Sequence, residues 1–160
     1  MAIPADFNAL WNIIPTTATI RSKVPCIPNT DDYKETCCIQ LSYALNMCGL
    51  PINYFNKGRV LTCNGMEFML AVKEMRDYLG STYGDAEIIK RVDVNGNLIG
   101  RIAIKAYLDS RQGVIAFGQR HIDLWNGTEI HGKAVVTDGI WDAPSAISQG
   151  IFFWDVSPAS

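Results

Sequence analysis

Apolar residues recur at intervals of three and four along the first half of the chain, which is the spacing that one face of a helix requires. This pattern predicts helices over residues 4–14, 36–46 and 65–79. Prolines and small polar residues fill residues 15–35, so a loop is expected between the first two helices. Residues 51–64 show no clear period and are expected to be irregular.

The last third of the chain has the pattern of strands. Residues 113–118 are apolar throughout, which favours a central strand covered on both faces. Residues 121–125 alternate, and the Asn-Gly pair at 126–127 is a strong hairpin signal, so residues 128–131 are expected to return antiparallel. Residues 150–156 form a last, aromatic-rich strand. Because helices come first and strands last, the order predicts an α+β fold with N-terminal helices packed on an antiparallel sheet.

Composition narrows the class of protein. The length of 160 residues fits one domain over residues 1–160, and 48% hydrophobic with 19% charged residues is an ordinary globular composition. The net charge of −2 and the lack of a basic run argue against nucleic-acid binding. No apolar stretch approaches the ~20 residues of a membrane span. Residues 1–7 lack the pattern of a secretory signal, so export by the signal-peptide route is not expected.

Five cysteines leave the redox state open. An odd number is compatible with one reactive thiol and up to two bridges, and equally with five reduced thiols. No CxxC pair exists and there are only two histidines, so neither a structural zinc site nor another cofactor is expected. Cys26 and Cys63 lie in predicted loops that a disulfide could join. Cys38 is interpreted as a packing residue or a bridge partner, and Cys48 as a core residue.

Cys37 lies at the predicted start of the second helix, where a thiol has a physical reason to be reactive. The first N–H groups of a helix have no internal partner, and the peptide dipoles add partial positive charge there. Both favour a thiolate and lower the pKa of a cysteine. Thr36 is the expected N-cap, with its hydroxyl accepting an N–H of the first turn. The backbone N–H of Cys37 or Cys38 would then stabilise an oxyanion.

The predicted hairpin supplies a base for this thiol. His121 begins the strand before the Asn-Gly pair, and a two-residue turn would bring His131 opposite Ile122. Diagonal neighbours lie roughly 7–8 Å apart, and a one-residue bulge would place the two histidines directly opposite. We therefore expect Cys37 to attack, His121 to take and return the proton, and His131 to hold the imidazole.

Three further residues are candidates for substrate binding. Asp123 shares a strand face with His121, so its carboxylate could shape the cleft or bind a substrate amine, or lie in solvent. Trp125 is a candidate for the cleft wall or the core. Tyr33 precedes the nucleophile and could donate to an oxyanion or lie on the surface.

Three segments carry a resemblance to a known family. ETCCIQLSYALNMCGLPI, VKEMRDYLGSTYG and RHIDLWNG resemble the type VI secretion amidase effectors, most closely their fourth subfamily, in the NlpC/P60 branch of papain-like peptidases. The resemblance runs from about residue 5 to residue 156. It implies a papain-like fold with Cys37 as nucleophile and His121 as base. The other positions that match the pattern around the nucleophile are Ser42, Tyr43, Leu45 and Asn46.

The chain also departs from this family. Gln40 stands where the family has Arg, and Arg120 stands where it has Gly. The family's third catalytic residue is an Asp shortly after the Asn-Gly turn, and no Asp occupies that place here. Glu129, His131 and Asp138 are the available groups, and NlpC/P60 relatives with a His on the return strand favour His131.

The resemblance implies an antibacterial amidase that cuts the peptide stems of peptidoglycan, with the γ-D-glutamyl–diaminopimelate bond as target. It also implies delivery by a type VI secretion apparatus to the periplasm of the target cell, and a periplasmic immunity protein as partner. Two alternatives remain at this point: a papain-like protease, deamidase or transglutaminase acting on a protein, and a catalytically inactive binding module of the same fold.

Overall fold

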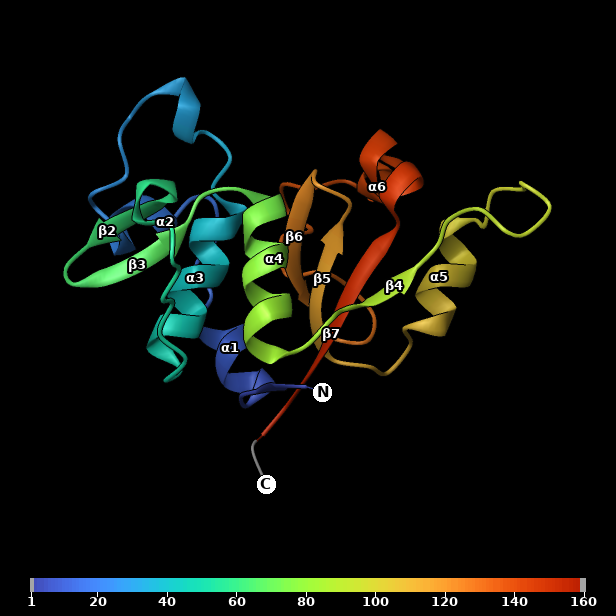
Figure 1. Ribbon diagram of the computed structural model, residues 1–160, viewed down its shortest axis with the longest axis horizontal. Coiled ribbons are helices and arrows are strands. Elements are labelled where there is room, and N and C mark those ends of the chain that lie inside the picture. Colours follow the sequence, from blue (N-terminus) through green and yellow to red (C-terminus); the bar gives the residue numbers. More distant parts are fainter. Residues whose placement is uncertain (1, 159–160) are drawn as a thin grey trace.

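The central sheet is built mostly from the last third of the chain, and helices from the first half cover one of its faces (Figure 1). The computed structural model describes residues 2–158. The helices are α1 Phe7–Ile13, α2 Ile20–Lys23, α3 Cys37–Met47, α4 Val72–Tyr83, α5 Arg101–Tyr107 and α6 Pro144–Gln149, with 3₁₀ turns at Asp31–Tyr33, Lys57–Arg59 and Asp138–Asp142. The strands are β1 Ile3–Pro4, β2 Val60–Cys63, β3 Met66–Met69, β4 Glu87–Ile89, β5 Gly113–Phe117, β6 His121–Trp125 and β7 Ile151–Ser157.

The strands β1, β7, β5 and β6 follow one another in the main sheet, and β4 pairs with β7 as well. β5 lies inside the sheet and is buried at every position, as its apolar run predicts. It pairs antiparallel with β6, in a register that sets Phe117 opposite His121. The sheet is antiparallel as expected except at β1, which pairs parallel to β7. β6 is the last strand on its side of this order and is buried at every position.

Two apolar cores lie on opposite faces of this sheet. Because side chains alternate along a strand, Val114 and Ala116 of β5 face α1, α3 and α4, whereas Ile115 and Phe117 face α5, α6 and the turn Asp138–Asp142. Figure 1 shows the two groups of helices on either side of the sheet. The predicted packing of N-terminal helices on the sheet is confirmed. On the second face α6 was not predicted, and the apolar spacing of residues 98–108, which include α5, fits a strand or a helix equally.

The expected helix over residues 65–79 is wrong in its first half. Residues 66–69 form β3, which pairs with β2 in a hairpin, and the helix α4 begins only at Val72. Apolar positions at intervals of three and four continue from the strand into the helix, so the period alone hides the boundary. α4 also runs past Gly80 and ends at Gly84, whose φ of +100° suits a residue without a side chain.

A third apolar cluster joins this hairpin to the segment before Cys37. It contains Ile20 of α2, Ile39 of α3 and Phe68 of β3. A disulfide between Cys26 and Cys63 closes it, with a Cα–Cα distance of 5.7 Å. The disulfide between Cys26 and Cys63 that the sequence allows is therefore present. The segment expected to be a loop therefore contains the short helix α2 and is held against α3.

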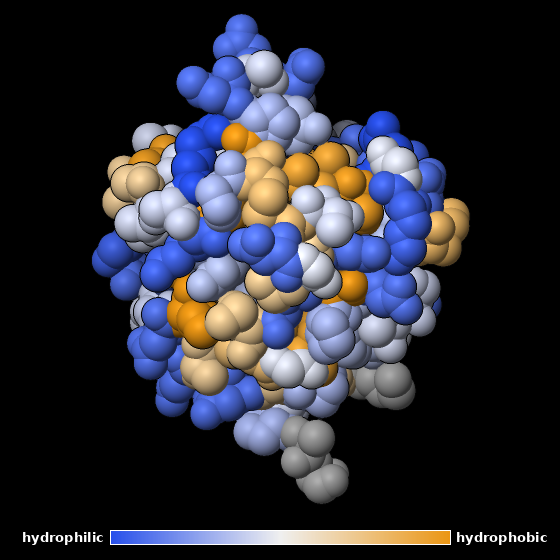
Figure 2. Space-filling model, turned by 90° about the vertical axis from the view of Figure 1, so that its left-hand side faces the viewer, coloured by the Kyte–Doolittle hydropathy of each residue, from blue (hydrophilic) through white to orange (hydrophobic). Residues whose placement is uncertain are grey.

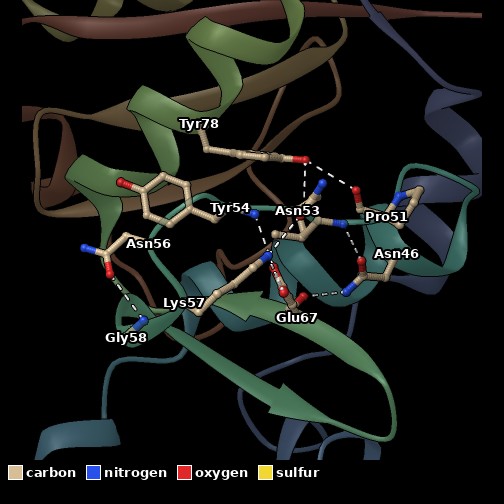
Figure 3. Close-up of polar contacts among 10 residues, drawn as sticks. Asn46, Pro51, Asn53, Tyr54, Asn56, Lys57, Gly58, Glu67 and Tyr78 are labelled. Carbon is tan, nitrogen blue, oxygen red and sulfur yellow. Dashed lines mark hydrogen bonds and ion pairs between the residues drawn. The ribbon is translucent and has the colours of Figure 1, made fainter.

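Hydrogen bonds tie the C-terminal end of α3 and the loop after it to neighbouring elements (Figure 3). Asn46 accepts the N–H of Ile52 at 2.7 Å and donates to the backbone oxygen of Glu67 in β3 at 2.8 Å. The hydroxyl of Tyr78 in α4 donates to the carbonyl of Pro51 at 3.3 Å. These bonds fix the direction of α3, and so the place where its first residue presents a thiol.

The face that carries the β2–β3 hairpin mixes apolar and hydrophilic side chains, and hydrophilic groups separate its apolar areas (Figure 2). Exposed apolar side chains that are scattered singly are normal on a protein surface. Within residues 2–158, no helix has the length and apolar character that crossing a membrane requires.

Candidate active site

Cys37 is the first residue of α3 and is partly exposed. Thr36 does not cap the helix in the expected way, because its hydroxyl donates to Oε1 of Gln40 at 3.0 Å and makes no capping bond. The amide of Gln40 in turn donates to the carbonyl of Pro15 at 2.8 Å. The N–H groups of the first turn therefore receive no bond from the cap side chain, and Gln40 ties the start of α3 to the neighbouring loop.

The thiol of Cys37 meets His121, which begins β6 at the edge of the sheet. The pKa of Cys37 is lowered well below its ordinary value, first because the thiol of Cys38 forms a hydrogen bond with it. Burial opposes this effect, but a hydrogen bond to His121, the positive charge of that imidazole and a backbone hydrogen bond from Ile122 lower the pKa further. Cys37 is thus a thiol for which the thiolate is the favoured form.

The imidazole of His121 is buried between Cys37 and a carboxylate. Its Nε2 lies 2.7 Å from Oδ2 of Asp123. Burial lowers its pKa, but hydrogen bonds to Asp123 and Cys37 and the negative charge on both groups outweigh this and raise the pKa to about 9. Since Asp123 occupies Nε2, Nδ1 is the nitrogen that remains for the thiol. The two shifts together favour a thiolate–imidazolium pair.

Two cavities open beside this pair. One, of about 460 Å³, is lined by Cys37 and His121 together with the charged residues Lys34, Glu35 and Arg120. The other, of about 260 Å³, shares the same two residues. Its further lining is largely apolar and includes Ile14, Ile122, Ala134 and Val135. A chain molecule can therefore lie across the thiol, with one side in a charged environment and the other in an apolar one.

The predicted register of the return segment is wrong. Trp125 pairs with Ile130 in an isolated bridge, and the N–H of His131 donates to the carbonyl of Leu124 at 3.0 Å. His131 therefore lies two positions from its expected place opposite Ile122. Its ring stands edge-on against Trp11, with centroids 4.8 Å apart, and lines the apolar cavity. The side chain bonded to His121 is Asp123 rather than His131, although both histidines border the same cavity.

The other candidates lie away from the thiol. Trp125 is buried in the second core, where its indole N–H donates to the carbonyl of Leu108 at 2.9 Å. Tyr33 packs against the third cluster. Glu129 and Asp138 pair with lysines on the surface, at 2.6 and 3.0 Å. Within residues 2–158, neither cavity beside Cys37 is lined by any of these four residues.

The remaining free thiols differ from Cys37. Cys38 is buried, and its pKa is raised well above the ordinary value by the hydrogen bond with Cys37 and by burial. Burial also raises the pKa of Cys48. Among the free cysteines of residues 2–158, only Cys37 has a pKa shifted towards the thiolate.

The partnership of Asp123 with His121 was missed in the sequence, although its signal was present. A His and an Asp two positions apart on a strand point to the same face, so a His-x-Asp pattern can pair them without any turn. From the sequence, Asp123 was expected only to shape the cleft, bind a substrate amine or lie in solvent. Gly132, whose N–H donates to Oδ2 of Asp123 at 3.1 Å, gave no signal in the sequence.

Comparison with known proteins agrees with this geometry. The family model of type VI secretion system amidase effector protein 4 (Tae4) matches residues 33–154. The Tae4–Tai4 effector–immunity complex of Enterobacter cloacae is similar with a TM-score of 0.70 at 21% identity, covering 97% of this chain and 100% of that one. The Tae4/Tai4 structure from Salmonella typhimurium gives 0.71 at 19% identity, with 96% and 99% covered. No curated protein sequence matches.

These likenesses confirm the α+β class and the papain-like NlpC/P60 fold. The family model spans well over half of the 160 residues and includes both Cys37 and His121. The chain therefore belongs to the type VI secretion amidase effector 4 family, whose members are amidases.

Proposed function

We propose that this amidase hydrolyses the γ-D-glutamyl–diaminopimelate bond in the peptide stems of bacterial peptidoglycan, with Cys37 as nucleophile and His121 as the acid and base. The observation that carries the proposal is the contact between a thiol at the start of α3 and a buried imidazole, with both groups lining two open cavities. Membership of an amidase effector family supports an amide as the bond that is cut.

The reaction follows from the charges on the pair. His121 takes the proton of Cys37, so the S–H bond breaks and an N–H bond forms at Nδ1. The thiolate attacks the carbonyl carbon of the substrate, and the oxygen becomes an oxyanion that the N–H groups at the start of α3 stabilise. The C–N bond then breaks as His121 returns its proton to the leaving amine. Water, deprotonated by the same imidazole, hydrolyses the thioester and regenerates Cys37.

The two cavities support a substrate with mixed charge. Lys34 and Arg120 can receive carboxylates, while Glu35 can receive an amine. A γ-D-glutamyl–diaminopimelate unit carries carboxylates on both residues and a free amine on the second, so its groups match this lining. Arg120 and Glu35 already lie 3.6 Å apart in an exposed pair, and a bound substrate would exchange that pair for its own charges.

The biological setting follows the family. We propose delivery by type VI secretion to the periplasm of the target cell, where the substrate lies, and a cognate periplasmic immunity protein as partner. Solved Tae4 structures from Enterobacter cloacae and Salmonella typhimurium are complexes with the immunity protein Tai4, which supports that partner. The disulfide between Cys26 and Cys63 is compatible with an oxidising compartment.

The test is digestion of purified sacculi by the wild type and by Cys37→Ala, with mass spectrometry of the released muropeptides. We expect the wild type to free the amine of diaminopimelate and the variant to release nothing. Release by both would remove Cys37 from the mechanism. Cleavage of a protein mixture without release from sacculi would favour a protease, and no turnover of either would favour a binding module.

The pH profile tests the pair itself. Because the pKa of Cys37 is lowered and that of His121 is raised to about 9, the thiolate–imidazolium form exists between the two values. Activity should therefore already be high at neutral pH and should fall as pH rises through about 9 and the imidazolium loses its proton. A rate that keeps rising through pH 9 would contradict the ion pair.

A further inference from the structure

The carboxylate beside His121 is held at both of its oxygens. Oδ1 of Asp123 accepts the N–H of Leu124 at 2.8 Å, and Oδ2 accepts the N–H of Gly132 at 3.1 Å as well as the contact with His121 Nε2 at 2.7 Å. The Asp123 side chain is only 6% exposed. A buried carboxylate with three hydrogen-bond partners keeps one orientation.

This arrangement sets the tautomer of the imidazole. In the contact with His121, Oδ2 of Asp123 is the acceptor, so Nε2 carries the hydrogen and Nδ1 presents its lone pair to Cys37. When Nδ1 takes the thiol proton, the imidazolium keeps its Nε2–H on Asp123. The carboxylate thus acts on the reaction through His121, without itself touching the substrate.

Gly132 faces the same nitrogen from the return segment. A Cβ at this position would lie 2.6 Å from Oδ2 of Asp123 and 3.8 Å from Nε2 of His121. The first distance is a clash. Gly132 is not among the residues with a positive φ, so its backbone does not require glycine. The physical reason for a glycine here is the space that the carboxylate of Asp123 occupies.

We propose that Asp123 is the positioning residue of His121, and that positions 123 and 132 form an exclusive pair, in which a carboxylate from either one, but not from both, can occupy the place beside Nε2. This inference rests on the proposed roles of Cys37 and His121. A carboxylate attached to the Cβ that residue 132 would carry can approach Nε2 once the side chain of residue 123 is short.

The test is a double-mutant cycle of Asp123→Ala, Gly132→Asp and the two changes together. Asp123→Ala removes the orientation of the base and should lower kcat by about 10²-fold or more, with KM little changed. Gly132→Asp alone forces two carboxylates into one place and should also lower kcat. The double variant should recover at least about tenfold over Asp123→Ala, because coupled residues depart from additivity.

Asp123→Asn separates positioning from packing, because it keeps the shape. Its amide would donate to Nε2 and place the hydrogen on Nδ1, which is the wrong tautomer for accepting the thiol proton. We expect the alkaline limb of the kcat profile, set by the His121 pKa of about 9, to move to lower pH. Asp138→Asn, on an exposed carboxylate that pairs with Lys105, is the matched control and should keep the wild-type profile.

A second measurement needs no substrate. Iodoacetamide should label Cys37 rapidly at pH 6 in the wild type, slowly in Asp123→Ala, and rapidly again in the double variant. Peptide mass spectrometry resolves the site, and Cys48 serves as the internal reference in each sample. This result would support the exclusive pair of positions 123 and 132 even if sacculi were not the substrate. The inference about these positions and the proposed substrate can therefore fail separately.

Two outcomes would overturn the inference. One is a folded Asp123→Ala variant, by circular dichroism and thermal unfolding, with the kcat and labelling rate of the wild type. The other is a folded double variant that is no more active and no more readily labelled than Asp123→Ala.

Discussion

Two of the three Asn-Gly pairs, those at residues 64–65 and 126–127, turn the chain in different ways. At the first, Asn64 and Gly65 have φ values of +51° and +78°, and Cys63 pairs directly with Met66. Positive φ at both central residues is the geometry of a tight two-residue hairpin. The dipeptide alone therefore sets both the turn and the register of the strands β2 and β3.

At the second pair, the dipeptide sets the turn but not the register. Only Gly127 has a positive φ there, and Oδ1 of Asn126 accepts the N–H groups of Thr128 and Glu129 at 3.0 and 2.9 Å. These bonds lengthen the turn, so that Ile130 is the first residue to pair across from Trp125. The same two letters thus give different registers, because side-chain hydrogen bonds compete with the strand ladder.

The difference decides the chemistry of the site. A two-residue turn would have placed His131 opposite Ile122, beside His121. The longer turn instead brings the N–H of Gly132 to Asp123, whose carboxylate already lies next to His121. The first turn belongs to a hairpin that supports α3, and the second brings Gly132 to the carboxylate that contacts His121.

Substituting Gly127 and Gly65 by alanine should give the largest difference in stability and kcat between the two turns. Gly127→Ala meets backbone atoms of Ser110 at 3.0–3.3 Å in a left-handed conformation. Left-handed strain of about 1–2 kcal/mol and overpacking of about 1–3 kcal/mol should together destabilise the protein by roughly 2–5 kcal/mol, and kcat should fall as Gly132 shifts. Thermal unfolding and sacculus digestion measure the two effects.

Gly65→Ala is the matched control for that change. It has a similar φ of +78°, but nothing lies within 4 Å of the new Cβ. We expect only the backbone strain, about 1–2 kcal/mol, with kcat unchanged. Equal losses of activity in the two variants would show that both turns shape the site equally. That result would contradict the claim that only the turn at residues 126–127 affects the site.

Removing the disulfide between Cys26 and Cys63 should have the next largest effect. It attaches the strand β2, directly before the first turn, to Cys26 over a sequence separation of 37 residues. Cys26→Ser with Cys63→Ser should lower the free energy of unfolding by about 2–4 kcal/mol. Because this region supports α3 rather than the base, kcat at a temperature where both proteins are folded should change little. A large loss of kcat in the folded variant would place the hairpin in the catalytic site.

The comparison also explains which features the sequence could predict. Cys37 and His121 could be found because each begins an element whose pattern is clear, a periodic helix and an alternating strand. β5 could be found because its apolar run has no polar interruption. The strand β3 could not be separated from α4 by periodicity, although the pair Asn64-Gly65 marked its start.

The place of His131 depended on information that periodicity does not contain. The expected role of His131 came from counting residues on a two-residue turn, and the register changed with three hydrogen bonds to one side-chain oxygen of Asn126. Pairing of Asp123 with His121 needed only alternation along one strand, which is the more reliable rule because no turn intervenes. Short-range geometry within one element is thus a better guide to such a pairing than geometry carried across a turn.

Truncating the two asparagines should give the smallest effects and probes the register most directly. Asn126→Ala removes the acceptor of the bonds from Thr128 and Glu129, and should cost about 1–2 kcal/mol. It should also loosen the placement of Gly132 and lower kcat modestly. Asn64→Ala, the control, loses mainly the tolerance of Asn for a left-handed backbone, about 1 kcal/mol, with kcat unchanged. If Asn126→Ala changed stability but left kcat and the labelling of Cys37 at wild-type values, the register would persist without these bonds, and the packing of Gly127 against Ser110 would be its sole determinant.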